Sequence, residues 1–550
     1  MKAVVWHALG DIRLDDVPEP KIKDPYDAIV RITTSAICGT DLHFIRGTMP
    51  GMQEGRVLGH EAVGVVEEVG SGVRNLRPGD RVVVPSTVAC GTCSYCRAGY
   101  YAQCDNANPA GPRAGTVFFG GPEAAGGLDG LQAEYARIPF AHVGLVPLPD
   151  TVDDAQAILV SDIYPTAWFG ARLAEVGDGD TVAVVGAGPV GQAAIACARL
   201  QGAGRVIVVD GLADRLDLAR DQHAETVDFN TEDPVEAVLE LTGGIGVDRV
   251  IEAVGVDAQR PAHGPAAEAL REQGEQFAHE RQEAAPEQNP DGSTWVPGDA
   301  PTLAARWAVQ MSAKAGTIGT VGVYPPQVQH YPYGEAFMKN LTLKMGNCNH
   351  RRYVPELVSM VAAGRLDPTP LITRWVGTED AIDAYRTFDR REAGWTKVTL
   401  GVAGDGSVAP GLGEAAGTGA GTTAGTQGPG RRTRAAEVTG HDRRGRREGA
   451  EDRGLLLRAL QREGACDTGR QDPVLPQRAQ GVRDPQERTR QQVVNGSLGV
   501  KGTESTAAPS GLHLSMPSCG QRAAAFWQQD TAASCSCGRP AGPRPSALGF

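Results

Sequence analysis

Apolar and polar residues alternate in short runs, separated by Gly, Pro and Asp turns, from Met1 to about Pro149. Runs such as DAIVRITTSAIC and DRVVVPSTVAC have strand length and are rich in β-branched residues, which favours strands. We therefore expect a compact, mostly β domain over residues 1–160.

Strand-like and helix-like runs alternate from about Thr151 to Tyr324: TVAVVGAG, PVGQAAIACARLQG, RVIVVD and ADRLDLARDQ follow one another. This alternation predicts an α/β domain over residues 161–325, with a doubly wound parallel sheet and helices on both faces. Residues 259–301 are too polar for the sheet, so we expect an insertion made of an exposed helix and a loop. Residues 326–400 contain strand and helix pieces that we expect to return to the first domain.

Beyond Leu400 the periodicity stops, and Gly, Ala, Thr and Arg dominate residues 401–550. Too little apolar area is available there to offset an ordering entropy of about 1–2 kcal/mol per residue, which predicts a disordered tail. The bias toward Arg over Lys is also what an out-of-frame reading of GC-rich DNA would produce, so the tail is a candidate for non-native sequence. The alternative is an Arg-rich arm for nucleic acid or membranes. We assign no role to the cysteines of this tail, which are Cys466, Cys519, Cys535 and Cys537.

The net charge of the chain also changes sign at about Leu400. The last 150 residues hold 18 Arg and one Lys against 14 acidic residues, whereas the first 400 carry a net charge of −18. An acidic body argues against nucleic acid as a partner, although small anionic cofactors can still bind through backbone donors.

The N-terminal MKAVVWHALGDIRLDD reaches charged residues before an apolar signal core forms, so we expect a cytoplasmic protein. Residues 181–198 are apolar enough to imitate a membrane span, but their glycines and proline predict a buried strand, turn and helix instead.

Four cysteines follow one another closely in a lobe over residues 88–106. Four thiolates on one short loop form a tetrahedral sulfur cage that suits zinc and leaves no position for a substrate. The spacing therefore predicts a structural zinc site. An iron–sulfur cluster and free thiols are the alternatives. The four residues are Cys90, Cys93, Cys96 and Cys104.

A second group of candidate residues lies upstream, in ICGTDLH and LGHEAVG. Cys38 and His60 are suitable zinc ligands, but two ligands do not make a site and other donors must come from elsewhere in the chain. The alternatives are a core cysteine and a surface His–Glu pair. Thr40, His43 and Glu61 lie in the same two motifs.

The third pattern is GAGPVG, a G-x-G-x-x-G between an apolar strand and a helix. The first glycine allows the turn, the second admits a pyrophosphate against the backbone, and the third lets the helix approach the strand. Asp210 follows 19 residues after the last of these glycines, where a carboxylate accepts hydrogen bonds from the adenosine ribose and repels a 2′-phosphate, which predicts NAD. A tight turn without a ligand is the alternative. The candidate cofactor residues are Gly186, Gly188, Pro189, Val190, Gly191, Asp210 and Arg215.

Taken together, ICGTDLH, GHEAVGVVEEVG, the four-cysteine lobe and GAGPVG resemble the zinc-containing medium-chain dehydrogenase/reductase superfamily over about residues 1–400. GGLDGLQAEYARIP, VSDIYPTAWFGA and the insertion are most similar to glutathione-independent formaldehyde dehydrogenases and their alcohol dehydrogenase relatives. The resemblance implies a GroES-like catalytic domain that clasps a Rossmann domain, with the site in the cleft between them.

The same resemblance implies two zinc ions per subunit. Cys38, His60 and Asp162 would hold the catalytic zinc, and the four lobe cysteines the structural one. Asp162 replaces the cysteine of classical alcohol dehydrogenases, and its alternative role is a helix N-cap. Glu61 would lie behind these ligands or ligate occasionally.

The resemblance also implies an activity: hydride transfer from an alcohol or a hydrated, formaldehyde-like aldehyde to NAD. Thr40 is two residues from a zinc ligand and can reach the substrate oxygen, and the proton would pass on through the cofactor ribose to His43. No motif fixes the substrate. A sorbitol- or threonine-type secondary-alcohol dehydrogenase and a catalytically silent nucleotide-binding scaffold are the alternatives. Relatives suggest a homo-tetramer built partly through the Rossmann sheets.

Overall fold

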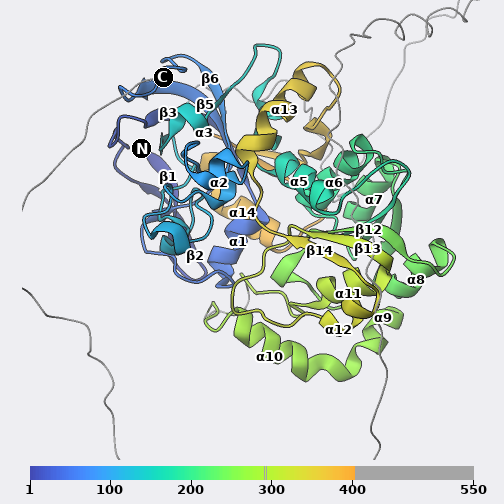
Figure 1. Cartoon of the computed structure of the whole chain (residues 1–550). Coiled ribbons are helices and arrows are strands. Elements are labelled where there is room, and N and C mark those ends of the chain that lie inside the picture. The colour runs from blue at the N-terminus through green and yellow to red at the C-terminus, as the bar shows by residue number, and fades with distance from the viewer. Residues whose placement is uncertain (290–291, 293, 403–550) are drawn as a thin grey trace, which may run out of the picture. The chain divides into compact units, whose positions relative to one another are not determined.

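The computed structural model describes residues 1–289, 292 and 294–402. The sequence predicts the tail over residues 401–550, but Gly401 still belongs to a strand and Val402 is buried; residues 403–550 lie outside the described residues. The described part forms the compact unit shown in Figure 1, in which the N-terminal β-rich domain packs beside the α/β domain.

The N-terminal domain contains a seven-stranded sheet and a three-stranded sheet. The first has the order β15-β16-β3-β5-β6-β8, with β7 also paired to β3, and the second has the order β2-β1-β4. Their strands are β1 (Lys2–Ala8), β2 (Asp11–Asp16), β3 (Ala28–Ile37), β4 (Arg56–Val57), β5 (Ala62–Val69), β6 (Arg81–Val84), β7 (Tyr135–Ile138), β8 (Val146–Pro147), β15 (Arg374–Gly377) and β16 (Val398–Gly401). The accompanying helices are α1 (Gly39–Arg46), α2 (Ser94–Arg97), α3 (Ala141–Gly144), α4 (Asp154–Leu159), α14 (Ala381–Asp389) and the 3-10 turns η1 (Tyr101–Gln103), η2 (Gly111–Arg113), η3 (Glu123–Ala125), η6 (Thr369–Leu371) and η7 (Thr378–Asp380).

The second domain is a six-stranded, all-parallel sheet with the order β11-β10-β9-β12-β13-β14. Numbered along the chain this is the order 3-2-1-4-5-6 of the Rossmann fold, so the expected fold class is confirmed. The strands are β9 (Thr181–Val185), β10 (Arg205–Asp210), β11 (Glu225–Asp228), β12 (Val247–Glu252), β13 (Ser312–Thr320) and β14 (Thr342–Met345). The helices are α5 (Ile163–Leu173), α6 (Pro189–Leu200), α7 (Ala213–Asp221), α8 (Pro234–Leu241), α11 (Leu303–Met311) and α12 (Tyr333–Met338). A further helix, α13 (His350–Ala362), follows the last strand and shares a core cluster with α5.

Apolar side chains cover both faces of this sheet, as its runs of Val, Ile and Ala require. Val182 and Val184 of β9 contribute to one core cluster together with residues of α5, α6 and α13, whereas Ala183 and Val185 point into a second cluster with α11. Figure 1 shows α5 and α6 on one side of β12 and β13, and α11 on the other. Residues 181–198 form the expected buried strand, turn and helix.

The parallel sheet extends beyond the boundary at residue 325 that the sequence suggested. β14 pairs with β13 in register Thr317 to Thr342, which places residues 326–345 in the Rossmann domain. A polar loop and a short helix precede β14, so the sequence does not show that this strand continues the alternation of strands and helices. The return to the first domain therefore follows Met345, and it is completed when β16 pairs antiparallel with β3.

The insertion is only partly the exposed segment that its polarity suggested. It contains α9 (Gly264–Ala269), η5 (Arg271–Gln273) and α10 (Gly274–Ala284), and it follows η4 (Gly255–Asp257). Trp295 is buried in the core cluster of the first domain with Trp6 and Phe44. A Cβ atom at Gly47, where α1 ends with φ 86°, would lie 2.4 Å from the carbonyl oxygen of Glu287. The insertion thus packs closely against the first domain.

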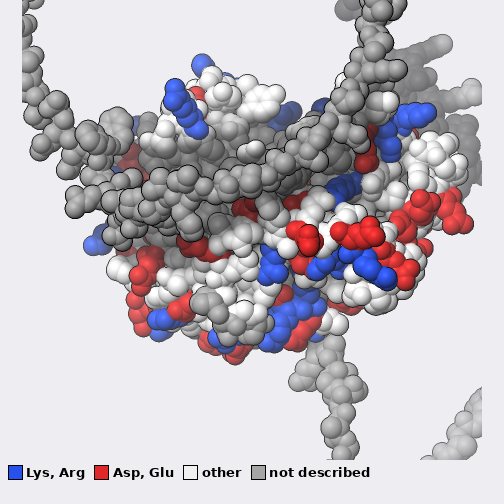
Figure 2. All heavy atoms as spheres, turned by 90° about the horizontal axis from the view of Figure 1, so that it is seen from below, with Lys and Arg blue, Asp and Glu red and all other residues white. Residues whose placement is uncertain are grey.

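Charged side chains of both signs lie interspersed on the face seen in Figure 2, where grey atoms do not cover it. None of the helices in the described residues combines the length and apolar character needed to span a bilayer.

Candidate active site and metal centres

A cavity of about 200 Å³ lies between the two domains. The first domain contributes Cys38, Thr40 and His60, and the Rossmann domain contributes the turn at Gly188 and residues that follow β12. The three residues predicted for the catalytic metal therefore line one cavity together with Gly188, Pro189 and Val190 of the predicted cofactor turn, although the two groups are far apart in the sequence.

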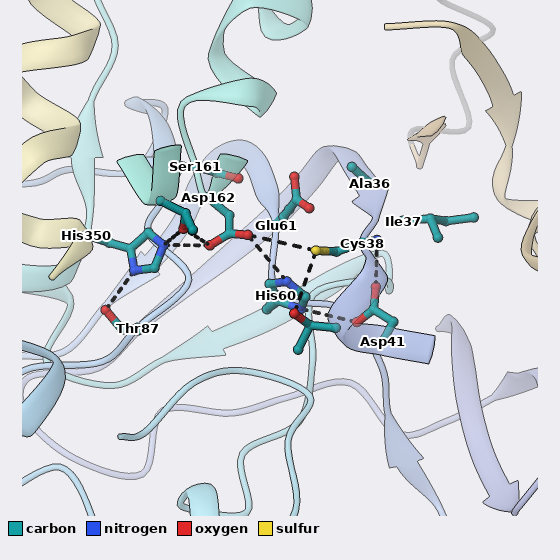
Figure 3. Close-up of polar contacts among 12 residues, drawn as sticks. Ala36, Ile37, Cys38, Asp41, His60, Glu61, Thr87, Ser161, Asp162 and His350 are labelled. Atoms are coloured by element: carbon teal, nitrogen blue, oxygen red, sulfur yellow. Dashed lines mark hydrogen bonds and ion pairs between the residues drawn. The ribbon is translucent and has the colours of Figure 1, made fainter. Parts of the chain in front are cut away.

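Cys38, His60 and Asp162 all line this cavity, and their side chains come together (Figure 3). Cys38 directly precedes α1, His60 precedes β5, and Asp162 precedes α5. Asp162 Oδ2 lies 4.0 Å from Cys38 Sγ and 3.6 Å from His60 Nε2, and all three side chains are buried. One thiolate, one imidazole and one carboxylate form a donor set that suits zinc and leaves a fourth position open.

The orientation of His60 comes from Asp41 in the first turn of α1. Asp41 Oδ1 lies 3.1 Å from His60 Nδ1, and Oδ2 accepts the backbone N–H of Cys38 at 3.0 Å. A carboxylate at Nδ1 leaves Nε2 free to act as a metal ligand. Burial lowers the pKa of His60, but Asp41 and the Cys38 thiolate outweigh it and hold this pKa well above its usual range. The anionic neighbours of His60 therefore stabilise a positive charge placed among them.

Asp162 does not act as a helix cap. It occupies the N-cap position of α5, yet its side chain makes no capping hydrogen bond. Instead, Oδ1 accepts hydrogen bonds from His350 Nε2 at 2.5 Å and from Thr166 Oγ1 at 3.3 Å. His350 Nδ1 lies 3.1 Å from Thr87 Oγ1, so the ring is held at both nitrogens. These contacts direct Oδ2 toward Cys38 and His60.

Glu61 lies in the same group of possible ligands but has a partner of its own. Lys397 of β16 donates to both of its carboxylate oxygens, at 2.6 and 2.7 Å, and also to the carbonyl oxygen of Ile37. Both side chains are fully buried. A buried carboxylate that is paired in this way is neutralised, so Glu61 is not available as a ligand while the pair persists.

The four lobe cysteines also converge. Their sulfur atoms lie within 4.8 Å of one another, and the 4.0 Å between Cys93 and Cys104 is close to the roughly 3.8 Å expected in a tetrahedral ZnS₄ site. Backbone N–H groups of Thr92 and Cys93 donate to Cys90 Sγ. Burial raises the pKa of the Cys90 thiol, but these hydrogen bonds and that of the Thr92 hydroxyl bring it down to about 6. The lobe thus fits a bound metal.

The turn between β9 and α6 leaves no room for a side chain at its first and third glycines. Gly186 has φ 91°, and a Cβ atom at Gly191 would lie 1.8 Å from the carbonyl oxygen of Gly186. Gly188 precedes α6 without a side-chain cap, and Pro189 begins the helix. The first N–H groups of this 12-residue helix are therefore left for an anion.

Asp210 ends β10 beside this turn. Its Oδ2 accepts the backbone N–H of Ala187 at 2.7 Å, and its Oδ1 accepts those of Gly211 and Leu212 at 2.8 and 2.9 Å. Three of the four acceptor positions are thus used, which leaves one on Oδ2 for a ligand. Arg215 Nη1 lies 3.7 Å from the Cβ position of Gly188, so this guanidinium also lies at the turn.

Thr40 and His43 both line the cavity. Thr40 Oγ1 lies 3.8 Å from Cys38 Sγ, and His43 Nδ1 lies 2.7 Å from Thr48 Oγ1. Sequence reasoning missed Asp41, His350 and Lys397. Asp41 could have been found, because it occupies the third helical position after Cys38, where a capping acid reaches back to the N-cap N–H. His350 and Lys397 carry no such local signal, since only the fold brings them to the cluster.

A Rossmann sheet joined to a GroES-like domain, with a metal-type donor cluster in the shared cavity, defines a dehydrogenase of the zinc type. Comparison with known families agrees: residues 24–150 match the alcohol dehydrogenase GroES-like domain, and residues 189–277 match the zinc-binding dehydrogenase model.

Individual relatives agree as well. An uncharacterized zinc-type alcohol dehydrogenase-like protein AdhB of Bacillus subtilis is 35% identical over 73% of this chain and 100% of its own length. A glutathione-independent formaldehyde dehydrogenase of Pseudomonas aeruginosa is 41% identical over 48% of this chain and 67% of its own length. The structure of alcohol dehydrogenase TADH from Thermus sp. ATN1 is similar with a TM-score of 0.59 and 33% identity, over 73% of this chain and 100% of that one. The chain belongs to the zinc-containing medium-chain dehydrogenase/reductase superfamily, among its zinc-type alcohol dehydrogenases.

We expect His350→Ala to weaken metal retention at the Cys38 cluster about 10–100-fold, because Asp162 loses the hydrogen bond that directs its second oxygen. The measurement is the rate at which zinc passes from loaded protein to a chelator. The exposed His263, replaced by Ala, is the matched control. Equal release rates in both variants and the wild type would show that His350 does not orient the ligand.

Proposed function

We propose that the protein is a zinc-dependent oxidoreductase that transfers hydride from an alcohol or a hydrated, formaldehyde-like aldehyde to NAD. The observation that carries this proposal is that Cys38, His60 and Asp162 line the same cavity as the glycine-rich turn. A metal-bound substrate and a nucleotide would therefore meet there. The 41% identity to a formaldehyde dehydrogenase supports a hydrated aldehyde as one of the substrates.

Two zinc sites are part of the proposal. Cys38, His60 and Asp162 would hold the catalytic ion, and the four lobe cysteines would hold the structural one. When bound, the catalytic ion supplies a Lewis acid that lowers the pKa of a substrate hydroxyl. The protein contributes the buried cluster, its fixed donor orientation and the exclusion of bulk water.

Thr40 and His43 would move the hydroxyl proton. Thr40 lines the cavity with its hydroxyl beside the Cys38 sulfur, where it can accept a hydrogen bond from a substrate. Burial lowers the pKa of His43, although Asp257 partly counteracts this. A neutral imidazole at neutral pH is able to take up the proton, so His43 suits the acceptor at the far end of the path.

NAD is the proposed cofactor, and when bound it accepts the hydride. The turn at Gly186, Gly188 and Gly191 would receive its pyrophosphate at the start of α6, with Pro189, Val190 and Arg215 around it. Asp210 keeps one acceptor position for the ribose. Its negative charge disfavours a 2′-phosphate, which supports NAD over NADP.

A substrate panel tests the proposal directly. Zinc-loaded protein is incubated with NAD or NADP and with formaldehyde, ethanol, benzyl alcohol, sorbitol or threonine, and reduced cofactor is followed by absorbance. We expect reduction of NAD with formaldehyde or a primary alcohol, and two zinc ions per subunit by metal analysis. Activity confined to sorbitol or threonine would favour a secondary-alcohol dehydrogenase. Turnover of none of these, with one zinc per subunit, would indicate a silent nucleotide-binding scaffold.

Thr40→Ala should lower kcat about 10²–10⁴-fold, because the proton of the substrate hydroxyl loses its acceptor. Zinc content should not change, since Thr40 is not among the clustered metal donors. Thr40→Ser, which restores a hydroxyl, is the matched control and should recover most of the activity. An alanine variant that turns over like wild type would remove Thr40 from the proton path.

We further propose a homo-oligomer that pairs along the outer edge of the Rossmann sheet. β14 ends the strand order, and Met345 on it is 59% exposed. Phe337 and Met338 of the neighbouring α12 are each 79% exposed, which is unusual for large apolar side chains. Phe337→Lys should therefore shift the mass measured by light scattering toward the monomer. The exposed Ile245, replaced by Lys, is the control, and an unchanged mass in both variants would contradict this interface.

A further inference from the structure

His43 has an acidic neighbour that comes from the other domain. Asp257 lies in η4, directly after β12 of the Rossmann sheet, and its Oδ2 is 3.3 Å from His43 Nδ1. Both side chains are buried. The sequence gives no hint of this pair, because 214 positions separate His43 from Asp257.

Asp257 is itself firmly held. Arg46 Nη1 donates to its Oδ2 at 2.6 Å, and the backbone N–H of Gly298 donates to its Oδ1 at 3.0 Å. Burial raises the pKa of Asp257, but Arg46 and His43 lower it far more, so the carboxyl remains ionised. The second charge partner of Arg46 is Asp389 of α14, at 2.7 Å. A buried ion cluster thus joins α1, η4 and α14.

The contacts of His43 determine which ring nitrogen carries the hydrogen. Asp257 can only accept, because it is ionised. The Thr48 hydroxyl lies 3.5 Å from the carbonyl oxygen of His43 and donates to it, which leaves its lone pair toward His43 Nδ1 at 2.7 Å. Both neighbours of Nδ1 are therefore acceptors, so Nδ1 carries the hydrogen. Nε2 has no hydrogen-bond partner recorded among the described residues and is left as a base.

We propose that Asp257 is a positioning residue for the dehydrogenation: it holds His43 in the tautomer whose Nε2 accepts the proton. This inference rests on the proposed role of His43 as proton acceptor. Because Asp257 belongs to the Rossmann domain and His43 to the catalytic domain, the acceptor is assembled only where the two domains pack together. The turn η4, which directly precedes the insertion, thereby contributes to the chemistry at the cavity.

The charges around His43 set the expected pH dependence. Burial and Arg46 lower the pKa of His43, whereas Asp257 and Asp41 raise it. Loss of the Asp257 charge would lower this pKa further. The imidazole would then be a weaker base, and its tautomer would no longer be fixed, so that a smaller fraction presents a free Nε2.

Asp257→Asn tests the inference, with Asp389→Asn as the matched control, because each removes one negative charge from Arg46 and only the first contacts His43. We expect kcat of Asp257→Asn to fall at least about tenfold. KM for the alcohol and the affinity for NAD should stay within about twofold, and kcat of Asp389→Asn within about threefold. Asp257→Glu, which keeps the charge for Arg46 but displaces it, is the second variant if the asparagine variant does not fold.

A readout independent of turnover is ¹⁵N NMR of histidine-labelled protein, in which the His43 signals are assigned by their loss in His43→Gln. Wild type should show the Nδ1–H form, and Asp257→Asn a mixture of both tautomers. An unchanged tautomer, or equal losses of kcat in the Asp257 and Asp389 variants, would overturn the inference. If the wild type oxidised no substrate, the proposed function would fail, while the NMR comparison would still report whether Asp257 sets the tautomer.

Discussion

The structure depends on one constraint: several acidic groups are buried side by side and each needs a partner of its own. Cys38 and Asp162 lie 4.0 Å apart in the interior, with Glu61 next to them. Unpaired, such groups would cost several kcal/mol each on burial. His60 partners Asp41, His350 partners Asp162 and Lys397 partners Glu61, which meets this need. The same contacts leave the ligand atoms of Cys38, His60 and Asp162 close enough to hold a metal ion. The pairing that stabilises the buried acids therefore also arranges these candidate ligands.

The same constraint explains why the catalytic domain is built from two distant parts of the chain. Lys397 reaches Glu61 from β16, which pairs with β3 and so places its ammonium group behind the cluster. Tyr385 of α14 donates to Gln132, which in turn lies 3.4 Å from Asp41. The N-terminal part supplies the predicted ligands, and the returning part neutralises or orients groups around them. Without the return, Glu61 would lose its buried counter-charge Lys397.

Local patterns in the sequence predicted the ligand-type residues and the order of the domains, because a cysteine lobe or a glycine turn is encoded within a few positions. Asp162 was foreseen only through family resemblance, and only the structure could show that its side chain makes no capping hydrogen bond and accepts one from His350 instead. β14 was assigned to the wrong domain, since a short strand after a polar loop gives no periodicity. His350, Lys397 and Asp257 could not be predicted, because their partners lie hundreds of positions away and a lone His, Lys or Asp is usually a surface residue.

The insertion shows how a polar composition can mislead. Its many charged residues suggested exposure, yet it follows Asp257, which belongs to a buried ion cluster, and near its end it buries Trp295 in the core of the first domain. The buried guanidinium of Arg46 requires anionic partners, and these are Asp257, just before the insertion, and Asp389 of α14. The backbone of Trp295 donates to the second of these acids, Asp389. The insertion is therefore tied at both ends to the helix that carries His43, which links the domain interface to the candidate site.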